Sequence, residues 1–278
     1  GVSGEGFDPT IGKLHRSGKP IPESELAELY TDIAFRQSIA TCLLCQNSNL
    51  HKVDDEWESV GDPTDSACAV FGWKLKESVD AYRRRHPRFR EFTFDRTRKR
   101  MTTIHEFDGQ KWAFSKGALG PFMGVSTHIY EDGEIVPLKG RHKDRISEIN
   151  LEYASRSYRV LALCARRVTD DVDIDSVDSV ESEMIFLGLV GIMDPPRPEV
   201  MDSISKCHAA GIRVTMITGD QRMTAMAVGK EIGIVADDSD HMSGRELREC
   251  TDDELDDRLN TVTVFSRVTP DQKLRIVE

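Results

Sequence analysis

Long apolar runs, aromatic residues and excess positive charge are all scarce in this sequence. The longest apolar stretch, MIFLGLVGIM at 184–193, is about half the length that a membrane-spanning helix needs. The Gly-rich, polar opening GVSGEGFDPTIGK is unlike a signal peptide. The net charge is −11 and the pI about 5.3, whereas nucleic-acid-binding domains usually have a pI above about 9. With 38% hydrophobic residues, the composition is typical of a globular protein with its own core.

Paired cysteine motifs are also scarce. Six cysteines are spread along the chain, and only Cys42 and Cys45 form a CxxC motif. A zinc site would need a second pair or nearby histidines, which the sequence does not supply. Because TCLLC continues a helical apolar pattern, we interpret both residues as reduced core cysteines of a protein in a reducing cytosol.

The first two thirds of the chain predict an α+β domain over residues 1–183. The apolar spacing predicts one long helix from Pro22 to Cys45, and Asp62–Pro63 is typical of the start of a second helix. The segments FREFTFD, MTTIHEF and KWAFSKG predict an antiparallel meander, so we expect an antiparallel sheet flanked by helices. The acidic stretch at 169–183 has little apolar content and is interpreted as a surface connection.

From residue 184 onward, apolar strands alternate with helical segments. We expect strands at 184–193, 212–218 and 261–267, with helices between them and another beginning at Pro270. Continuous apolar strands that alternate with helices predict a parallel sheet. Residues 184–278 are therefore expected to form part of an α/β domain, with the last helix barely begun.

Polar and charged residues follow each of these three strands. Ligands of open α/β sheets bind at the carboxyl ends of the strands, and a hydroxyl followed by glycine suits a phosphoryl oxygen. The alternative for TGD is an ordinary strand-ending turn whose aspartate caps a helix. The residues expected at this site are Asp194, Thr218, Gly219, Asp220, Arg267 and Lys273.

A second candidate site lies in the predicted meander. Phe94 stands beside Arg96, and Lys116 lies on a neighbouring strand before Gly117, which permits close approach to the backbone. A purine could stack on Phe94 while its phosphates reach the cations. The alternatives are a core aromatic for Phe94 and a solvated surface lysine for Lys116. Since the basic residues of FTFDRTRKRM are confined to one hairpin, a single nucleotide fits better than a nucleic acid.

Several stretches together resemble one known family. They are GDPTDSA, FDRTRKRM, FSKGA, YRVLAL, LGLVGIMDPPRPEV, GIRVTMITGD and FSRVTPDQKLRIVE. Their order and spacing are similar to those of cation-transporting P-type ATPases, most of all the type II pumps that move calcium, or sodium and potassium. The resemblance covers nearly the whole chain. It implies a nucleotide-binding domain at 1–183 and part of a haloacid-dehalogenase-like phosphorylation domain at 184–278.

The resemblance also implies an adenine site in the first domain. Asp65 stands where the family has a glutamate that hydrogen-bonds the adenine amino group, Phe94 matches the aromatic that stacks on adenine, and Lys116 matches a lysine deep in the pocket. The shorter Asp65 and the sequence KGALG, in place of KGAPE, depart from the family pattern. The remaining implied contacts are Arg96 near the β-phosphate, Gly117 and Ala118 in the wall, Arg159 at the phosphates and Leu161 at the purine.

In the second domain the resemblance implies a phosphoryl site. Thr218 and Lys273 match the second and third signature elements of the haloacid-dehalogenase phosphotransferases, and Asp194 matches the aspartate of DPPR. Gly219 and Asp220 complete the TGD that contacts the phosphoryl group, and Arg267 is a further cation. The phosphorylated aspartate of DKTGT would precede residue 1, and the Mg²⁺ ligands of GDGxND would follow Glu278. No metal ligand is expected within these 278 residues.

The resemblance implies that the chain is a piece of a larger, multi-pass membrane pump, and that this piece lies on the cytoplasmic side of the membrane. Its expected ligands are ATP and ADP, with Mg²⁺ in the whole pump, and its partners are the transmembrane and actuator domains of the same chain. By itself the fragment should be inactive. The first alternative is a haloacid-dehalogenase phosphatase with a large cap, which is weakened because no DxDx[TV] motif follows a predicted strand. The other is an interaction module that binds nucleic acid or acidic lipid. The cation that the whole pump transports is a further expected partner.

Overall fold

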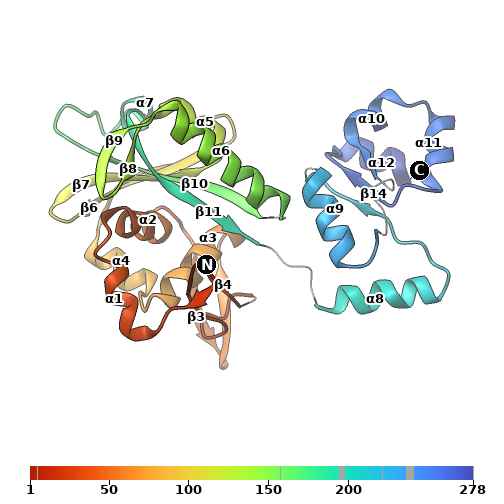
Figure 1. Ribbon diagram of the computed structural model, residues 1–278, viewed down its shortest axis with the longest axis horizontal. Coiled ribbons are helices and arrows are strands. Elements are labelled where there is room, and N and C mark those ends of the chain that lie inside the picture. The colour runs from red at the N-terminus through yellow and green to blue at the C-terminus, as the bar shows by residue number, and fades with distance from the viewer. Residues whose placement is uncertain (5, 157, 194–197, 221, 236–240, 278) are drawn as a thin grey trace. The chain divides into compact units, whose positions relative to one another are not determined.

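The computed structural model describes residues 1–4, 6–156, 158–193, 198–220, 222–235 and 241–277, and these form two compact units (Figure 1). The first unit contains Gly1–Ser147 and Val160–Ile192, and the second contains Glu148–Arg159 and Met193–Glu278. None of the helices in the described residues combines the length and apolar character needed to span a membrane.

A seven-stranded sheet forms the centre of the first unit. Its strand order is β5-β6-β7-β10-β11-β8-β9, and β5, β6 and β7 form the predicted antiparallel meander. The prediction of an antiparallel sheet throughout is wrong, because β8 and β11 run parallel and the sheet is mixed. The strands are β5 (Arg88–Asp95), β6 (Arg100–Phe107), β7 (Gln110–Gly117), β8 (Ser126–Glu131), β9 (Glu134–Pro137), β10 (Arg159–Arg167) and β11 (Met184–Ile192).

Strand β11 corrects the expected division of the chain at residue 184. We expected this apolar strand to begin the α/β domain, but it lies between β10 and β8 in the first unit. Met184 and Phe186 pack into the core cluster around Phe122, whereas Leu187 packs into the cluster around Cys42. Because both faces of β11 are covered, its sequence is continuously apolar, a pattern that parallel sheets share.

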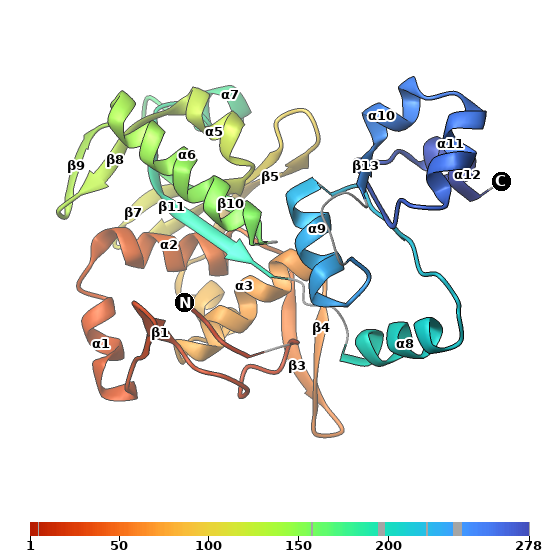
Figure 2. The same ribbon diagram turned by 45° about the vertical axis from the view of Figure 1, so that its right-hand side comes forward.

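Helices cover both faces of this sheet (Figure 2). One face carries α2, α3 and α4, and the other carries α5 and α6. The long helix expected at 22–45 is interrupted, because the Asp32 carboxylate caps a new helix by accepting from the amides of Ala34 and Phe35. Asp62 caps α3 as predicted. The helices are η1 (Glu23–Glu25, 3₁₀), α1 (Leu26–Leu29), α2 (Ile33–Leu44), α3 (Pro63–Lys74), α4 (Val79–Arg85), α5 (Leu119–Val125), α6 (Gly140–Ser155) and α7 (Val177–Val180).

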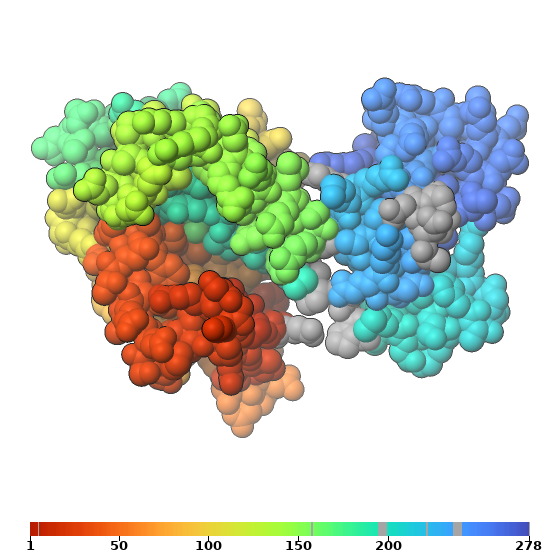
Figure 3. Space-filling view, viewed as in Figure 1, coloured from red at the N-terminus to blue at the C-terminus, as the bar shows by residue number. Residues whose placement is uncertain are grey.

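Two small hairpins lie outside the main sheet. In the space-filling view the N-terminal segment, drawn in red, lies at the surface of the first unit (Figure 3). The Lys74 ammonium donates to the carbonyl of Pro9 at 3.4 Å, which ties this segment to α3. The hairpins are β1 (His15–Arg16) with β2 (Lys19–Pro20), and β3 (Asn49–Val53) with β4 (Glu56–Val60).

The acidic stretch at 169–183 is not the surface connection that we expected. It contains the short helix α7, and Val172 and Val180 are buried against Ile104 and Ala113 of the sheet. Glu181, directly after this helix, is only 2% exposed. A few valines spaced through the acidic residues are therefore enough to dock the segment on the sheet.

The second unit contains a three-stranded parallel sheet of order β12-β14-β13. The strand expected at 212–218 is shorter than predicted, because only Met216 and Ile217 pair with β14. The elements are α8 (Pro198–Ala209), β12 (Met216–Ile217), α9 (Arg222–Glu231), β13 (His241–Ser243), α10 (Gly244–Glu249), α11 (Asp252–Leu259), β14 (Val264–Ser266) and α12 (Pro270–Val277).

The buried ring of His105 is expected to make the first unit less stable in mild acid. Burial lowers the pKa of His105 to about 4, although its Nδ1 lies 2.9 Å from the His86 carbonyl oxygen. The unfolded chain binds this proton below about pH 6.5, so stability falls as the pH drops from about 6.5 to about 4. This contribution amounts to about 2 kcal/mol between pH 7 and pH 5.

Urea unfolding followed by tryptophan fluorescence measures this effect, because Trp57, Trp73 and Trp112 all lie in the first unit. His105→Asn keeps a donor near the His86 carbonyl but cannot titrate. It should therefore lose about 2 kcal/mol less than the parent chain over this pH range. An equal loss in both proteins would contradict the assignment to His105.

Candidate functional site

Lys116 and Asp65, two of the predicted binding residues, form an ion pair inside the first unit. Lys116 is only 5% exposed, and its ammonium binds the carboxylate of Asp65 on α3. The other carboxylate oxygen of Asp65 accepts from the backbone amide of Asn47 at 2.9 Å. Burial lowers the pKa of Lys116, but Cys68, Cys45 and Asp65 raise it more, so the pKa lies above its usual value. Lys116 is a fixed buried cation, not a solvated surface lysine.

Phe94 lies at a β-bulge, on the same face of the sheet as Lys116. The register between β5 and β6 shifts between Phe92 and Asp95, so two β5 residues, Phe94 among them, lie opposite the single residue Met101. Met101 in turn pairs directly with Lys116 on β7. Directly paired residues point to the same face, and Phe92 packs on the other one. Phe94 is 60% exposed, so it is not a core aromatic.

The four basic side chains of the hairpin turn differ in their exposure and in their partners. The guanidinium groups of Arg98 and Arg100 both bind the buried carboxylate of Glu181. Arg96 is exposed and has no hydrogen-bond or ion-pair partner among the described residues. Lys99 is exposed as well and has a left-handed backbone, with φ of 52°. Two of the four basic side chains are thus paired with a buried carboxylate, so the cationic surface is smaller than the sequence suggests.

The end of β7 is packed closely against this turn. Gly117 pairs with Arg100, and a Cβ atom at Gly117 would lie 2.3 Å from the Lys99 carbonyl oxygen. The amide of Ala118 donates to the same oxygen at 3.0 Å. Glycine is therefore required here by space rather than by its φ angle. The contact also fixes the turn that carries Arg96 relative to the strand that carries Lys116.

Strand β10 carries the last two predicted residues of this site. Leu161 is half-buried and lies two positions before Leu163, which pairs with Lys116, so both leucines point to the Lys116 face. Arg159 is exposed at the start of β10, and its contact with phosphates stays a prediction.

In the second unit, the predicted TGD and Arg267 lie at adjacent strand ends. The Thr218 hydroxyl donates to an Asp220 carboxylate oxygen at 3.0 Å, and the Arg267 amide donates to the Asp220 carbonyl at 2.9 Å. A Cβ atom at Gly219 would meet no described atom within 4 Å, so the backbone there is open to a ligand. Lys273 is exposed on α12. Asp194 lies outside the described residues, and the strand before it belongs to the sheet of the first unit.

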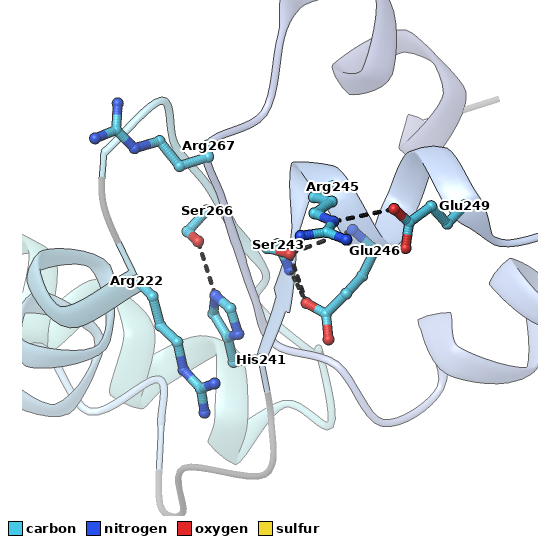
Figure 4. A pocket seen from close by; sticks show the side chains of 8 residues that line it. All are labelled: Arg222, His241, Ser243, Arg245, Glu246, Glu249, Ser266 and Arg267. Atoms are coloured by element: carbon cyan, nitrogen blue, oxygen red, sulfur yellow. Dashed lines mark hydrogen bonds and ion pairs between the residues drawn. The ribbon is translucent and has the colours of Figure 1, made fainter.

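A polar pocket of about 540 Å³ also lies in the second unit (Figure 4). The His241 Nε2 and Ser266 hydroxyl are 2.8 Å apart, and burial, with help from Arg222, holds the pKa of His241 below its usual value. The side chains of Arg222 and Arg267 extend away from each other, so they do not converge on one ligand. Sequence analysis singled out Arg267 alone, because no motif marks the rest. The lining residues are Arg222, His241, Ser243, Arg245, Glu246, Glu249, Ser266 and Arg267.

No group of three or more His, Cys, Asp or Glu side chains is placed to hold a metal ion within the described part of the chain. All six cysteines are free thiols, and Cys42 and Cys45 are buried as predicted.

A sequence model of the family described as "P-type ATPase, cytoplasmic domain N" matches residues 34–199, which is more than half of the chain. The chain therefore belongs to the P-type ATPases. This membership does not favour the phosphatase alternative.

Individual proteins of this family are similar in sequence to most or all of this chain. The chain is 37% identical over 244 residues to "Calcium-transporting ATPase 1" of Bacillus cereus. The match covers 87% of this chain and 27% of that protein. The chain is 34% identical over 278 residues to "Calcium-transporting ATPase" of Bacillus subtilis, covering 100% of this chain and 30% of the relative. "Cation-transporting ATPase pma1" of Synechocystis is 32% identical over 280 residues, and the match covers 100% of this chain and 30% of that protein. The chain thus spans less than a third of the length of these relatives.

Proposed function

We propose that this chain binds ATP on the sheet face that carries Phe94 and Lys116. The adenine ring stacks on Phe94, and Lys116 and Asp65 line the inner end of its site. Arg96 and Arg159 contact the phosphates, and Gly117, Ala118 and Leu161 form the walls. The observation that carries this proposal is the bulge, since it places an exposed phenylalanine on the face of a buried lysine ion pair. Aromatic stacking and nearby cations together suit a nucleotide.

The second unit is proposed to receive the phosphoryl end of the reaction. The hydroxyl of Thr218, the open backbone at Gly219 and the cations Arg267 and Lys273 suit a phosphoryl group at the carboxyl end of a parallel sheet. We propose that the second unit is part of a haloacid-dehalogenase-like domain. Asp194 and Asp220 are proposed to belong to the same site.

For the whole protein we propose an ATPase that couples ATP hydrolysis to cation transport across a membrane, with this chain on the cytoplasmic side. Two of the relatives above are named for calcium transport, so calcium is the proposed cargo. The adenine end of ATP would position the γ-phosphate for transfer to an aspartate, and positioning accounts for much of what phosphoryl transfer requires of a protein. Magnesium would neutralise the phosphates. The transmembrane and actuator domains of the parent chain would be its partners.

Replacing the stacking ring tests the binding proposal. Phe94→Ala should weaken ATP binding by roughly ten- to a hundredfold, because stacking of a base on an aromatic ring is worth about 1–3 kcal/mol. Isothermal titration calorimetry of the 278-residue chain with ATP measures this affinity.

Phe89→Ala is the matched control, because Phe89 is also exposed on β5, at 47%, but lies near the other end of the strand. It should leave the affinity within about twofold of that of the parent chain. If the parent chain does not bind millimolar ATP, or if both variants bind equally well, the proposed site is wrong.

A further inference from the structure

Glu181 is buried on the face of the sheet opposite the proposed nucleotide site. Its side chain is 1% exposed, and the carboxylate accepts from Arg98, from Arg100 Nε at 2.6 Å and from the Thr102 hydroxyl at 2.7 Å. Two partly buried guanidinium groups and one hydroxyl satisfy both carboxylate oxygens. Glu181 is the shared member of this cluster, since removing its charge would leave both guanidinium groups without their anion.

One of these arginines also holds the backbone next to Phe94. The Nη2 of Arg98 donates to the carbonyl oxygen of Thr93 at 2.8 Å, and its amide donates to the Asp95 carboxylate at 2.8 Å. Thr93 and Asp95 are the two chain neighbours of Phe94. The guanidinium group therefore connects Glu181 to the bulge from which the Phe94 ring projects.

The second arginine fixes the other side of the same turn. Arg100 pairs with Gly117 across the sheet, and its guanidinium lies over the Phe122 ring at 5.7 Å. Its Nε is held by Glu181. Glu181 thus holds the hairpin turn and the start of β6 together, and it touches neither Phe94 nor Lys116 in the contacts that the structure records.

We infer that Glu181 is a positioning residue for adenine recognition, and that it acts through Arg98 on the Phe94 bulge. This inference rests on the proposed function. A stacking ring gains affinity when it is fixed before the ligand arrives, because less conformational entropy is then lost on binding. On a bulge with no such support, the exposed Phe94 ring would have to be ordered by the nucleotide itself.

Glu181→Gln keeps the size of the side chain and removes the charge that holds both arginines. It should weaken ATP binding by about three- to tenfold in calorimetry of the 278-residue chain. Arg98→Ala should have a similar effect. It serves as the second variant if Glu181→Gln does not fold, because it leaves Glu181 paired with Arg100. The control is Arg90→Ala, which removes an arginine of β5 paired with Asp175 at 3.2 Å. It should change the affinity by less than about twofold.

A double-mutant cycle separates positioning from a general structural role. In the Phe94→Ala background, Glu181→Gln or Arg98→Ala should lower ATP affinity by less than about twofold, because the ring that they position is gone. Equal losses in both backgrounds, or no loss in the parent background, would overturn the role of Glu181. If Phe94→Ala itself leaves ATP affinity unchanged, it is the nucleotide site that fails.

Discussion

Lys116→Met is expected to lower the stability of the first unit by about 3–5 kcal/mol, because it leaves the carboxylate of Asp65 partly buried without its cation. It should also weaken ATP binding at least about tenfold, since a charge-assisted hydrogen bond is worth about 1.5–3 kcal/mol. Urea unfolding followed by tryptophan fluorescence and calorimetry with ATP measure the two effects.

A double substitution separates the two consequences of losing Lys116. Replacing a buried ion pair by apolar residues of similar size is often neutral, so Asp65→Leu with Lys116→Met should recover most of the lost stability. ATP affinity should stay low, because neither polar contact is restored. If the stable double variant bound ATP as the parent chain does, Lys116 and Asp65 would be structural residues only.

Gly117→Ala is expected to have the second large effect. The new Cβ atom would lie 2.3 Å from the Lys99 carbonyl and 2.7 Å from the Cα of Arg100, so backbone and not a flexible side chain would have to move. Overpacking of this kind costs about 1–3 kcal/mol. The basic turn would be displaced from β7, and ATP binding should weaken together with stability.

Gly124→Ala is the matched control for this change. Gly124 lies on α5, and a Cβ atom there would meet no described atom within 4 Å. Alanine in a helix is favoured over glycine by up to about 1 kcal/mol, so this variant should be as stable as the parent chain or slightly more so. Comparable losses in the two variants would show that the close packing of Gly117 against the turn is not what requires glycine.

Local patterns predicted the meander well and the sheet as a whole less well. FREFTFD, MTTIHEF and KWAFSKG form neighbouring antiparallel strands because short turns impose that pairing. The position of β11 depends on which surfaces cover it, and a continuous apolar run does not reveal whether helices of one unit or of another provide that cover.

The candidate site shows the same division between local and non-local information. Phe94, Lys116 and Asp65 were named from short motifs, but the ion pair joins residues 51 positions apart, and a spacing pattern does not contain it. Glu181 was missed because it lies in the acidic stretch at 169–183, whose composition is typical of a solvated segment. Its two arginine partners precede it by more than 80 positions. The signal that could have shown its packing on the sheet is the set of apolar residues Val172, Ile174 and Val180.

The most direct test of the account is the position of the adenine ring on the 278-residue chain. Intermolecular NOEs from the adenine H2 and H8 protons to the Phe94 ring and the Lys116 side chain, with ATP at saturation, measure it. The account requires NOEs to both residues and an upfield shift of the adenine protons from the ring current of Phe94. Saturable ATP binding with adenine NOEs to other residues, and none to Phe94, would contradict it.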